Sequence, residues 1–484
     1  MQRSWSNTQK FIGVLTAWLV LLAFAEQAHA IPTFSRKYRT SCITCHTIFP
    51  QLNDTGEAFR RNGYEFPSGE ETLVKDEPIP FGRDAYKDMW PDSIWPSDMP
   101  TLPPVFIRAQ LRSLFNTDPA PDGIKWDQDF PHEVVLGGAG TFGPNISAWW
   151  EIEWEPSEDA VSVERAFVQF SNLFAWDDED DEDGMRMGSR WLTLPKHALN
   201  IRAGKMQPQV LPHITSQHSR ISITQALPIR QRIGRNRFRF EPVQSAAVEV
   251  HGILQQRWAY VVGYANGGVV SSGHLEDNNN KDVYFRVARK WFGFPLDGVV
   301  GEVEPINGRA TVRGQSPDED YETAPAGLDH WRAIGLETGV FGWWGLSEIP
   351  FGGVTRRDWF RRIGIDARLQ WFDWNVYGLI YTGHDNFAGL VGGTDLGGED
   401  HLSYLVQAEY MVKPWWLTFV RYEQTDFNET ARTPQEQARV IPGMVFLIRQ
   451  NMKFQAEFVI DTTGKDTGGP QATDRFLLQL DYTY

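Results

Sequence analysis

Both cysteines of this 484-residue chain lie in one short stretch, and a histidine follows them directly. The stretch reads Cys42-Ile43-Thr44-Cys45-His46. Two thiols at this spacing can add to the two vinyl groups of a haem, and the adjacent histidine can bind the iron from one side. The motif therefore predicts one covalent haem c, held by Cys42 and Cys45, with His46 as an axial ligand.

Two other kinds of site use a pair of cysteines at the same spacing. A zinc site would need a second pair of ligands, which this pair lacks. A thioredoxin-like redox pair would lie in a βαβ pattern, and it would leave His46 without a role. Two cysteines are also too few for a disulfide scaffold. Haem attachment is favoured because it uses all three residues.

The residues after the motif predict a short helix that packs on a haem. Spacings of three, four and three place four residues on one helical face: Phe49, Leu52, Gly56 and Phe59. Pro50 suits a first helical turn, and Gly63 suits a helix end. Gly56 would leave room for a flat macrocycle. The alternative is an ordinary amphipathic helix, but so short a segment offers little core of its own. The haem or a surrounding protein wall is expected to complete it.

The first thirty residues have the features of a cleaved secretory signal. Arg3 and Lys10 form a basic segment, and residues 11–25 form an apolar run. Ala28-His29-Ala30 matches an A-x-A cleavage site, so the mature protein is expected to begin at Ile31. The alternative is an uncleaved membrane anchor, but a run of about 15 residues is short for a span of about 20.

The composition narrows the class of protein. Hydrophobic residues make up 41% and charged residues 22% of the chain, which fits neither a disordered chain nor a helical membrane bundle. The formal net charge of -16 disfavours nucleic acid as a partner, because phosphate binding needs a basic face.

From residue 104 onward, short runs alternate apolar and polar side chains at period two, with turn-forming residues between them. In one run, Ile363, Ile365 and Leu369 share a face, while the opposite face carries charge from Asp366 and Arg368. The same alternation recurs in residues 402–412, 451–460 and 475–484. Each run predicts a strand with one apolar and one polar face.

The strands of a soluble β-sandwich also alternate apolar and polar residues, so other features must distinguish a sandwich from a membrane barrel. The runs are about ten residues long, which a tilted strand needs to cross a bilayer. The last run ends on Tyr484. Aromatic residues gather at run ends, as in the interfacial girdles of membrane barrels: Trp149-Trp150, Trp343-Trp344, Trp371 with Trp374, and Trp415-Trp416. No apolar stretch of about 20 residues follows the signal, which leaves a closed barrel as the spanning structure.

The predicted fold class is mainly β: a transmembrane antiparallel β-barrel with a small N-terminal α-helical monohaem cytochrome c segment that plugs the lumen. The runs number about 16, with 14 or 18 possible, at roughly 24 residues per strand and loop. Charged inward residues indicate a polar lumen, or else a buried ion network that fills it. The expected divisions are the signal peptide (1–30), the haem segment (31–70), a linker (71–103) and the barrel (104–484).

Seven consecutive acidic residues run from Asp177 to Asp183. Such a run is typical of a solvated external loop. The alternative interpretation is a patch that concentrates divalent cations, since carboxylate oxygens bind hard metal ions. No spacing within the run specifies a particular metal.

Several stretches together resemble a known family. Near the start these are Phe34-Ser-Arg-Lys-Tyr38, the Cys42–His46 motif, Pro50-Gln-Leu-Asn53, Gly56-Glu-Ala-Phe59 and Asn62-Gly-Tyr64. Later ones are Val248-Glu-Val-His-Gly252, Tyr264-Ala-Asn-Gly267 and Asp277-Asn-Asn-Asn-Lys-Asp282. They resemble the fused monohaem cytochrome–porins of bacterial outer membranes, a family that includes outer-membrane iron oxidases. Of these stretches, only the N-terminal motif is specific.

The resemblance implies a barrel in outer-membrane lipid that encloses a haem-bearing plug. It implies an oxidoreductase that moves electrons from an extracellular donor, with Fe(II) as the expected donor, to a periplasmic c-type cytochrome. If the plug lies inside the barrel, a barrel residue could supply the second axial ligand. His218 ranks first for this role, with His213 and Met206 in the same segment.

Two functions compete with electron transfer from an extracellular donor. One is a selective porin whose haem plug is a structural or redox-sensing gate, which predicts solute flux that changes with the oxidation state of the haem. The other is a soluble periplasmic cytochrome with a β-rich partner domain, which predicts release without detergent.

Overall fold

The computed structural model describes residues 34, 44–48, 50–64, 105–117, 123–141, 145–156, 160–175, 194–214, 220–230, 238, 240, 245–266, 280–298, 333–351, 354–386, 390–391, 394–395, 397–427, 437–449, 451–462 and 474–483. The predicted signal peptide, the predicted linker and the acidic run lie outside these residues. No described helix is long and apolar enough to cross a membrane.

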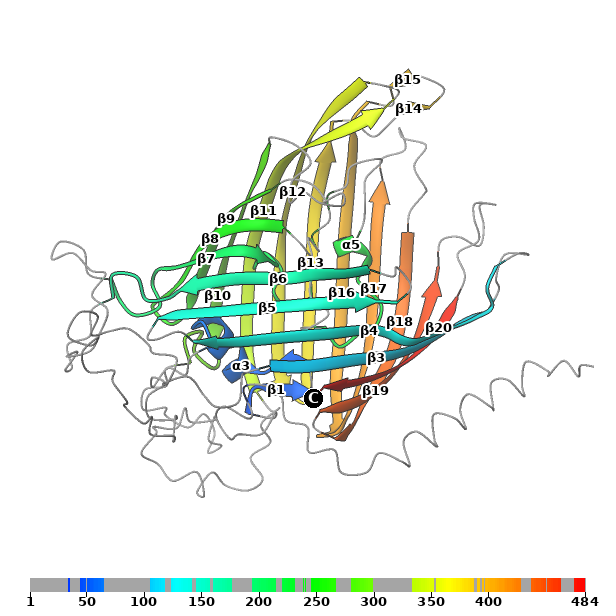
Figure 1. Cartoon of the computed structure of the whole chain (residues 1–484), viewed down its shortest axis with the longest axis horizontal. Helices are drawn as coiled ribbons and strands as arrows, with labels where there is room; N and C mark the ends of the chain where they lie inside the picture. Colours follow the sequence, from blue (N-terminus) through cyan, green and yellow to red (C-terminus); the bar gives the residue numbers. More distant parts are fainter. Residues whose placement is uncertain are drawn as a thin grey trace, which may run out of the picture.

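Sixteen antiparallel strands form a closed barrel, which confirms the strand count expected from the sequence (Figure 1). The strands are β3 (Val105–Asn116), β4 (Trp126–Thr141), β5 (Ile146–Glu155), β6 (Ala160–Phe170), β7 (Asn200–Met206), β8 (Ser245–Leu254), β9 (Trp258–Asn266), β10 (Lys281–Phe292), β11 (Ala333–Phe351), β12 (Val354–Phe372), β13 (Trp374–Asp385), β16 (Glu399–Lys413), β17 (Trp416–Phe427), β18 (Gln437–Arg449), β19 (Met452–Asp461) and β20 (Arg475–Thr483). β20 pairs with β3 and closes the ring. A separate small hairpin joins β14 (Leu390–Val391) and β15 (Thr394–Asp395).

The strands alternate as the sequence predicts, with apolar residues outside and polar residues inside. On β12, Ile363 and Ile365 are 39% and 54% exposed on the outer face. Further along the strand, Asp366 and Arg368 point inward and are buried. A continuous apolar outer surface around a polar interior is the arrangement of a barrel that spans a membrane.

In two of the three adjacent tryptophan pairs only one ring faces outward, so the girdle prediction is wrong for Trp149 and Trp343. Trp343 is 1% exposed and points into the barrel, while Trp344 is 39% exposed on the outside. Trp149 also packs inside, against Tyr64. Neighbouring residues within a strand point to opposite faces, so only one ring of each of these two pairs can join an outer girdle. Trp415 precedes β17 and stacks with Trp416 and Phe446 on the outside.

The two ends of the barrel differ. At the end where β20 finishes, five connections between strands contain only one to four residues. Short turns mark the periplasmic end of outer-membrane barrels. β6 ends and β7 begins at this same end. The connection that contains the acidic run therefore starts and finishes on the side of the short turns, and not at the opposite mouth.

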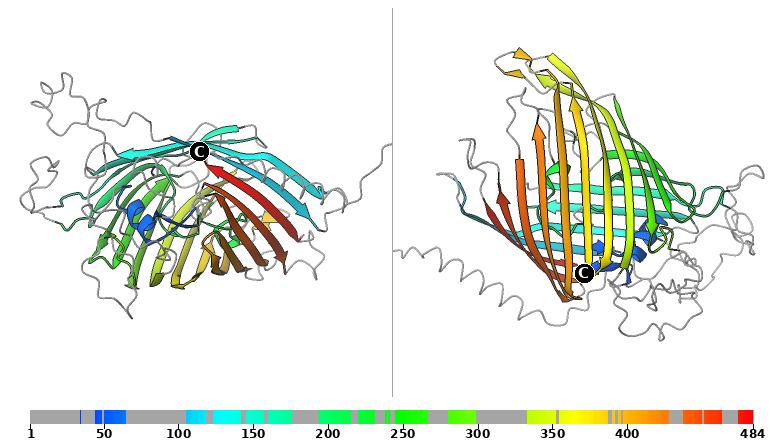
Figure 2. Two further views of the ribbon diagram at one scale, coloured as in Figure 1. Left: turned by 90° about the horizontal axis from the view of Figure 1, so that it is seen from below. Right: turned by 180° about the vertical axis from the view of Figure 1, so that it is seen from behind.

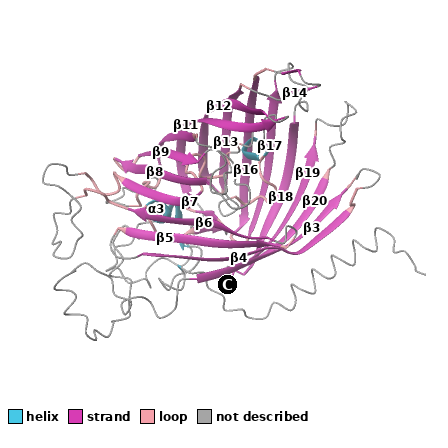
Figure 3. Ribbon diagram, turned by 45° about the horizontal axis from the view of Figure 1, so that its top comes forward, coloured by secondary structure: helices cyan, strands magenta, loops and turns pink. Residues whose placement is uncertain are grey.

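Two segments occupy the lumen (Figure 2). The first is the haem segment, with β1 (His46–Ile48), β2 (Gln51–Leu52) and α3 (Asp54–Arg61). The second is the connection from β7 to β8, which includes the short helix α5 (Leu227–Arg230). Figure 3 shows the barrel strands surrounding both. The hydrophobic core of this protein therefore lies inside the barrel, where these segments meet the wall.

The helix after the motif starts later than predicted. α3 begins at Asp54, after Asn53 as its N-cap, and Gly63 ends it with φ +78° as expected. Pro50 lies in the turn between β1 and β2, so its assignment to a first helical turn is wrong. The reason is local: the Asn53 side chain caps the backbone N–H of the helix start.

Candidate functional site

His46 is oriented by a hydrogen bond within its own hairpin. Its Nδ1 lies 3.1 Å from the carbonyl oxygen of Pro50, which can only accept, so Nδ1 donates. The ring then presents Nε2 as its metal-binding nitrogen, the usual arrangement in which a carbonyl fixes the tautomer of a metal-bound histidine. Burial lowers the pKa of His46 to about 4, so the ring is neutral at neutral pH. A metal-binding histidine must be neutral.

Asn53 ties the haem motif to α3. Its side-chain amide donates to the carbonyl of Thr44 at 3.1 Å, and its backbone N–H donates to the carbonyl of Cys45 at 3.0 Å. Its side-chain oxygen accepts from the backbone N–H of Gly56 at 2.9 Å. A Cβ at Gly56 would lie 2.1 Å from the Cys45 oxygen. The close approach that Gly56 permits is to the motif's own backbone, and not to a macrocycle as predicted.

These features fit a covalent haem c. Cys45 is a half-buried thiol beside His46, and Asn53 holds the backbone between them and the helix. Cys42 and His218 lie outside the described residues. Within the described part of the chain, no cluster of three or more His, Cys, Asp or Glu side chains is arranged to hold a metal ion.

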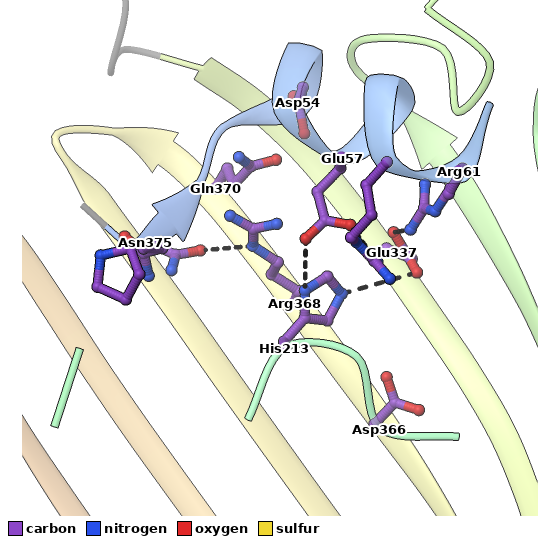
Figure 4. Close-up of polar contacts among 12 residues, drawn as sticks. Asp54, Glu57, Arg61, His213, Glu337, Asp366, Arg368, Gln370 and Asn375 are labelled. Atoms are coloured by element: carbon purple, nitrogen blue, oxygen red, sulfur yellow. Dashed lines mark hydrogen bonds and ion pairs between the residues drawn. The ribbon is translucent and has the colours of Figure 1, made fainter. Parts of the chain in front are cut away.

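Polar contacts join α3 and the hairpin to the barrel wall (Figure 4). Lys290 of β10 donates to Asp54 at 2.9 Å, and Arg61 lies 3.6 Å from Glu337 of β11. Gln51 donates to Glu409 of β16 at 2.6 Å. Further along, Asn62 donates to the carbonyl of Asp297 at 2.9 Å. The haem segment is therefore held in the lumen on several sides, near the end with the short turns.

His213 brings the β7–β8 connection to the haem segment. Its Nδ1 lies 3.9 Å from Glu57 of α3, and its Nε2 lies 3.8 Å from Glu337 on the wall. Burial lowers the pKa of His213, despite these two carboxylates. Glu57 has its pKa lowered to about 2: burial raises it, but Arg60, Arg61 and His213 outweigh burial. Met206, which lies in the same segment as His218 and His213, is fully buried in the hydrophobic core inside the barrel.

The sequence analysis did not name His251, a histidine on the inner face of β8. His251 is buried, and the charges of Arg60 and Arg61 on α3 act on its ring. Among the described residues its Nε2 has no hydrogen-bond partner. The alternation of side chains along residues 248–252 could have indicated its position, because His251 shares the inward face of the strand with Glu249.

Above the haem segment, the wall holds the β7–β8 connection by its backbone. Glu423 accepts from the backbone N–H of Leu227 at 3.0 Å, and Tyr381 donates to the carbonyl of Pro228 at 2.6 Å. Phe238 then packs between Phe360 and Trp343, with ring centroids 4.6 and 5.1 Å away. Among the described residues, buried apolar side chains of the connection and the wall form one packed cluster at this level.

Among known proteins, only solved structures are similar to this chain. No protein-family model matches the chain, and no curated protein matches its sequence. The anion-selective porin from Comamonas acidovorans is 12% identical with a TM-score of 0.48, covering 78% of this chain and 98% of the porin. The outer membrane protein OmpT of Vibrio cholerae in its trimer form is 10% identical with a TM-score of 0.46, covering 78% of this chain and 98% of its own. OmpF of Salmonella typhi in complex with daunomycin is 9% identical with a TM-score of 0.46, covering 78% and 97%.

Proposed function

We propose that this protein is an outer-membrane cytochrome–porin that carries one haem c on a plug inside its barrel. It moves electrons from an extracellular donor, Fe(II) in the iron oxidases that the sequence resembles, to a periplasmic c-type cytochrome. One observation carries the proposal: Cys45 and His46 lie on a segment that is anchored inside a closed 16-strand barrel, towards the end with the short turns. A redox group there would be separated from bulk solvent by the barrel wall.

The residues of the plug have defined tasks in this proposal. Cys42 and Cys45 hold the haem covalently, and His46 binds its iron through Nε2 while Pro50 fixes the ring. The bound haem supplies one-electron chemistry, since its iron alternates between the ferric and ferrous states. The contacts of α3 with the wall fix the distance of the site from both mouths. His218 stays a prediction for the second axial position.

The fold also supports a second candidate, a selective porin with a structural or redox-gating plug. The lumen is lined by buried charges such as Arg286 and Asp366, which would select solutes by charge. The β7–β8 connection crosses this lumen and the haem segment lies below it. A solute pathway would therefore require one of the two segments to move.

A visible absorbance titration of the oxidised, detergent-purified protein with Fe(II) under anaerobic conditions tests the proposal. Rapid appearance of the reduced haem bands is expected for the wild type. A Cys42→Ala/Cys45→Ala variant is the control and should bind no covalent haem. Solute flux in liposomes is measured alongside. If dithionite reduces the haem and Fe(II) does not at any pH, Fe(II) is not the donor. If flux changes with oxidation state as well, the gated porin is the better description.

A further inference from the structure

Four of the seven residues 356–362 on β12 are arginines, in a chain whose formal net charge is -16. This part of β12 lies at the mouth opposite the short turns. Figure 1 shows this mouth at the top, beside β14 and β15, and the C-terminus at the other end. Asp358 and Arg362 point into the barrel, where they are buried. Arg357 and Arg361 alternate with them and are exposed on the outer face. The outside of this mouth therefore carries concentrated positive charge.

The height of Arg361 in the membrane follows from the strand. β12 and β13 are joined by Asp373 alone, so Trp371 lies at the end with the short turns. Ten residue steps separate Trp371 from Arg361, which is roughly 25 Å along the membrane normal for a rise of about 3.3 Å and a tilt of about 40°. The apolar band of a membrane barrel is about 25 Å tall. All outward residues between the two are apolar: Ile363, Ile365, Ala367 and Leu369. Arg361 therefore lies where the hydrocarbon ends and the lipid headgroups begin.

Aromatic rings surround Arg361 on the outer face. Trp344 of β11 lies directly across from it in the strand register and is 39% exposed. Trp344 stacks on Phe285 of β10, with ring centroids 5.7 Å apart. Trp359, two residues from Arg361, is 60% exposed. Exposed tryptophans mark the membrane–water interface, so the rings and the apolar band give the same height for Arg361.

The acids nearby leave both outward arginines accessible to another anion. Among the described residues, no carboxylate forms an ion pair with Arg361. His384, directly across from Arg361 on β13, contacts Asp400 at 2.7 Å. Arg357 contacts Glu348 at 3.6 Å, and its side chain remains 70% accessible. Two cations at the headgroup level therefore face the membrane surface.

We propose that Arg357 and Arg361 bind phosphate groups of the phosphorylated glycolipid in the outer leaflet of the membrane. The inference goes beyond the proposed function and shares with it only the outer-membrane location and orientation of the barrel. Phosphate oxygens match the planar fork of a guanidinium, which donates two parallel hydrogen bonds to them. Trp344 and Trp359 offer apolar surface to the upper part of the acyl chains, with their ring N–H groups towards the headgroups.

The two arginines are expected to contribute unequally. Arg357 lies four residues further along β12, roughly 10 Å further from the hydrocarbon than Arg361. Arg361 is therefore the nearer group to the phosphates that join the acyl-bearing sugars, and Arg361→Gln should weaken binding more than Arg357→Gln.

The test titrates diphosphoryl lipid A into the full-length protein in detergent and measures bound lipid by native mass spectrometry. Dephosphorylated lipid A and phosphatidylglycerol are the comparison lipids. The double variant Arg357→Gln/Arg361→Gln should bind diphosphoryl lipid A about tenfold more weakly than wild type, since one basic group near an anionic lipid surface contributes roughly fivefold. Lys413→Gln/Arg449→Gln is the control, because it removes the same charge from exposed positions at the end with the short turns.

Each outcome decides the inference. Equal binding by wild type and the double variant overturns it, and so does equal binding of phosphorylated and dephosphorylated lipid A by wild type. If phosphatidylglycerol binds as tightly as diphosphoryl lipid A, the two arginines recognise any anionic lipid and the assignment to the glycolipid is wrong. If the double variant does not fold, Arg361→Gln is compared with Lys413→Gln, and equal binding by these two again overturns the inference. Haem content by the pyridine haemochrome assay should be the same in all variants, so failure here leaves the electron-transfer proposal intact.

Discussion

The lower and the upper lumen are held together by different forces. In the lower lumen, around α3, the plug contacts the wall through charged and polar pairs such as Lys290 with Asp54. In the upper lumen, the β7–β8 connection packs through aromatic rings, with the ring of Phe238 5.1 Å from that of Trp343 on the wall. Buried ion pairs add little net stability but strongly disfavour misplaced partners, whereas buried aromatic rings stabilise directly. We infer that charge sets the position of the plug and that packing fixes the connection above it.

The largest expected effect comes from the upper lumen. Trp343→Ala removes a fully buried ring and should lower the free energy of unfolding by about 3–5 kcal/mol. Trp344→Ala is the matched control, because the neighbouring ring faces outward. Both are compared by denaturant unfolding in detergent micelles. Equal losses in the two variants would show that the inner aromatic cluster has no special role.

A fall in pH should destabilise the plug in the lower lumen before it affects the aromatic packing of the upper lumen. The pKa of Glu57 is lowered from 4.5 to about 2 because Arg60, Arg61 and His213 outweigh burial, so the folded plug binds fewer protons than the same segment unfolded. The folded plug therefore keeps its full stability above pH 4.5 and loses it as the pH falls toward 2, by an amount on the order of 3 kcal/mol. Hydrogen exchange of α3 across this range measures the loss. Unchanged protection of α3 between pH 5 and pH 2.5 would contradict the charge-based docking, and Glu57→Gln should weaken the pH dependence.

Breaking one ion pair should release the plug without unfolding the barrel. Lys290→Met leaves Asp54 without its 2.9 Å partner and should weaken docking by about 2 kcal/mol. That corresponds to roughly 30-fold faster cleavage of the plug by a protease, at an unchanged Tm of the barrel. The double variant Lys290→Met/Asp54→Leu should recover most of the protection, since an apolar pair can replace an ionic one. A global fall in Tm in the single variant would mean that the plug contacts support the whole barrel.

The smallest expected effect concerns the link between the motif and α3. Asn53→Ala removes the helix cap and the bond to the Thr44 carbonyl, at a cost of about 1 kcal/mol. Asn53→Asp keeps the capping oxygen but loses the donor to Thr44, so it separates the two contributions. Covalent haem yield and the exchange rates of the α3 amides are the measurements. If Asn53→Asp behaves like Asn53→Ala, the donor to Thr44 is the important contact.

Alternation was sufficient to predict the barrel, and haem attachment stays a prediction from the spacing of the two cysteines. Each strand carries its own period-two pattern, as Ile363 and Ile365 show against Asp366 and Arg368, because a strand's two faces meet different solvents. The helix start was missed by a few residues, since Asn53 competes with Pro50 as the first signal of a helix. Two tryptophan pairs, Trp149-Trp150 and Trp343-Trp344, were assigned together although neighbouring side chains of a strand point to opposite faces.

The sequence by itself determined the two-sided alternation of the strands and their approximate number, since both follow from local periodicity, while haem attachment at Cys42 and Cys45 stays a prediction from spacing. Only the tertiary structure decided what fills the lumen. The contact of Gln51 with Glu409 joins positions 358 residues apart, and no local pattern reports such a pair. The same holds for His213, which lies between the plug and the wall. Asp366 and Arg368 share one strand face in the sequence, but in the folded lumen Asp366 pairs with Arg286 of β10 at 2.7 Å.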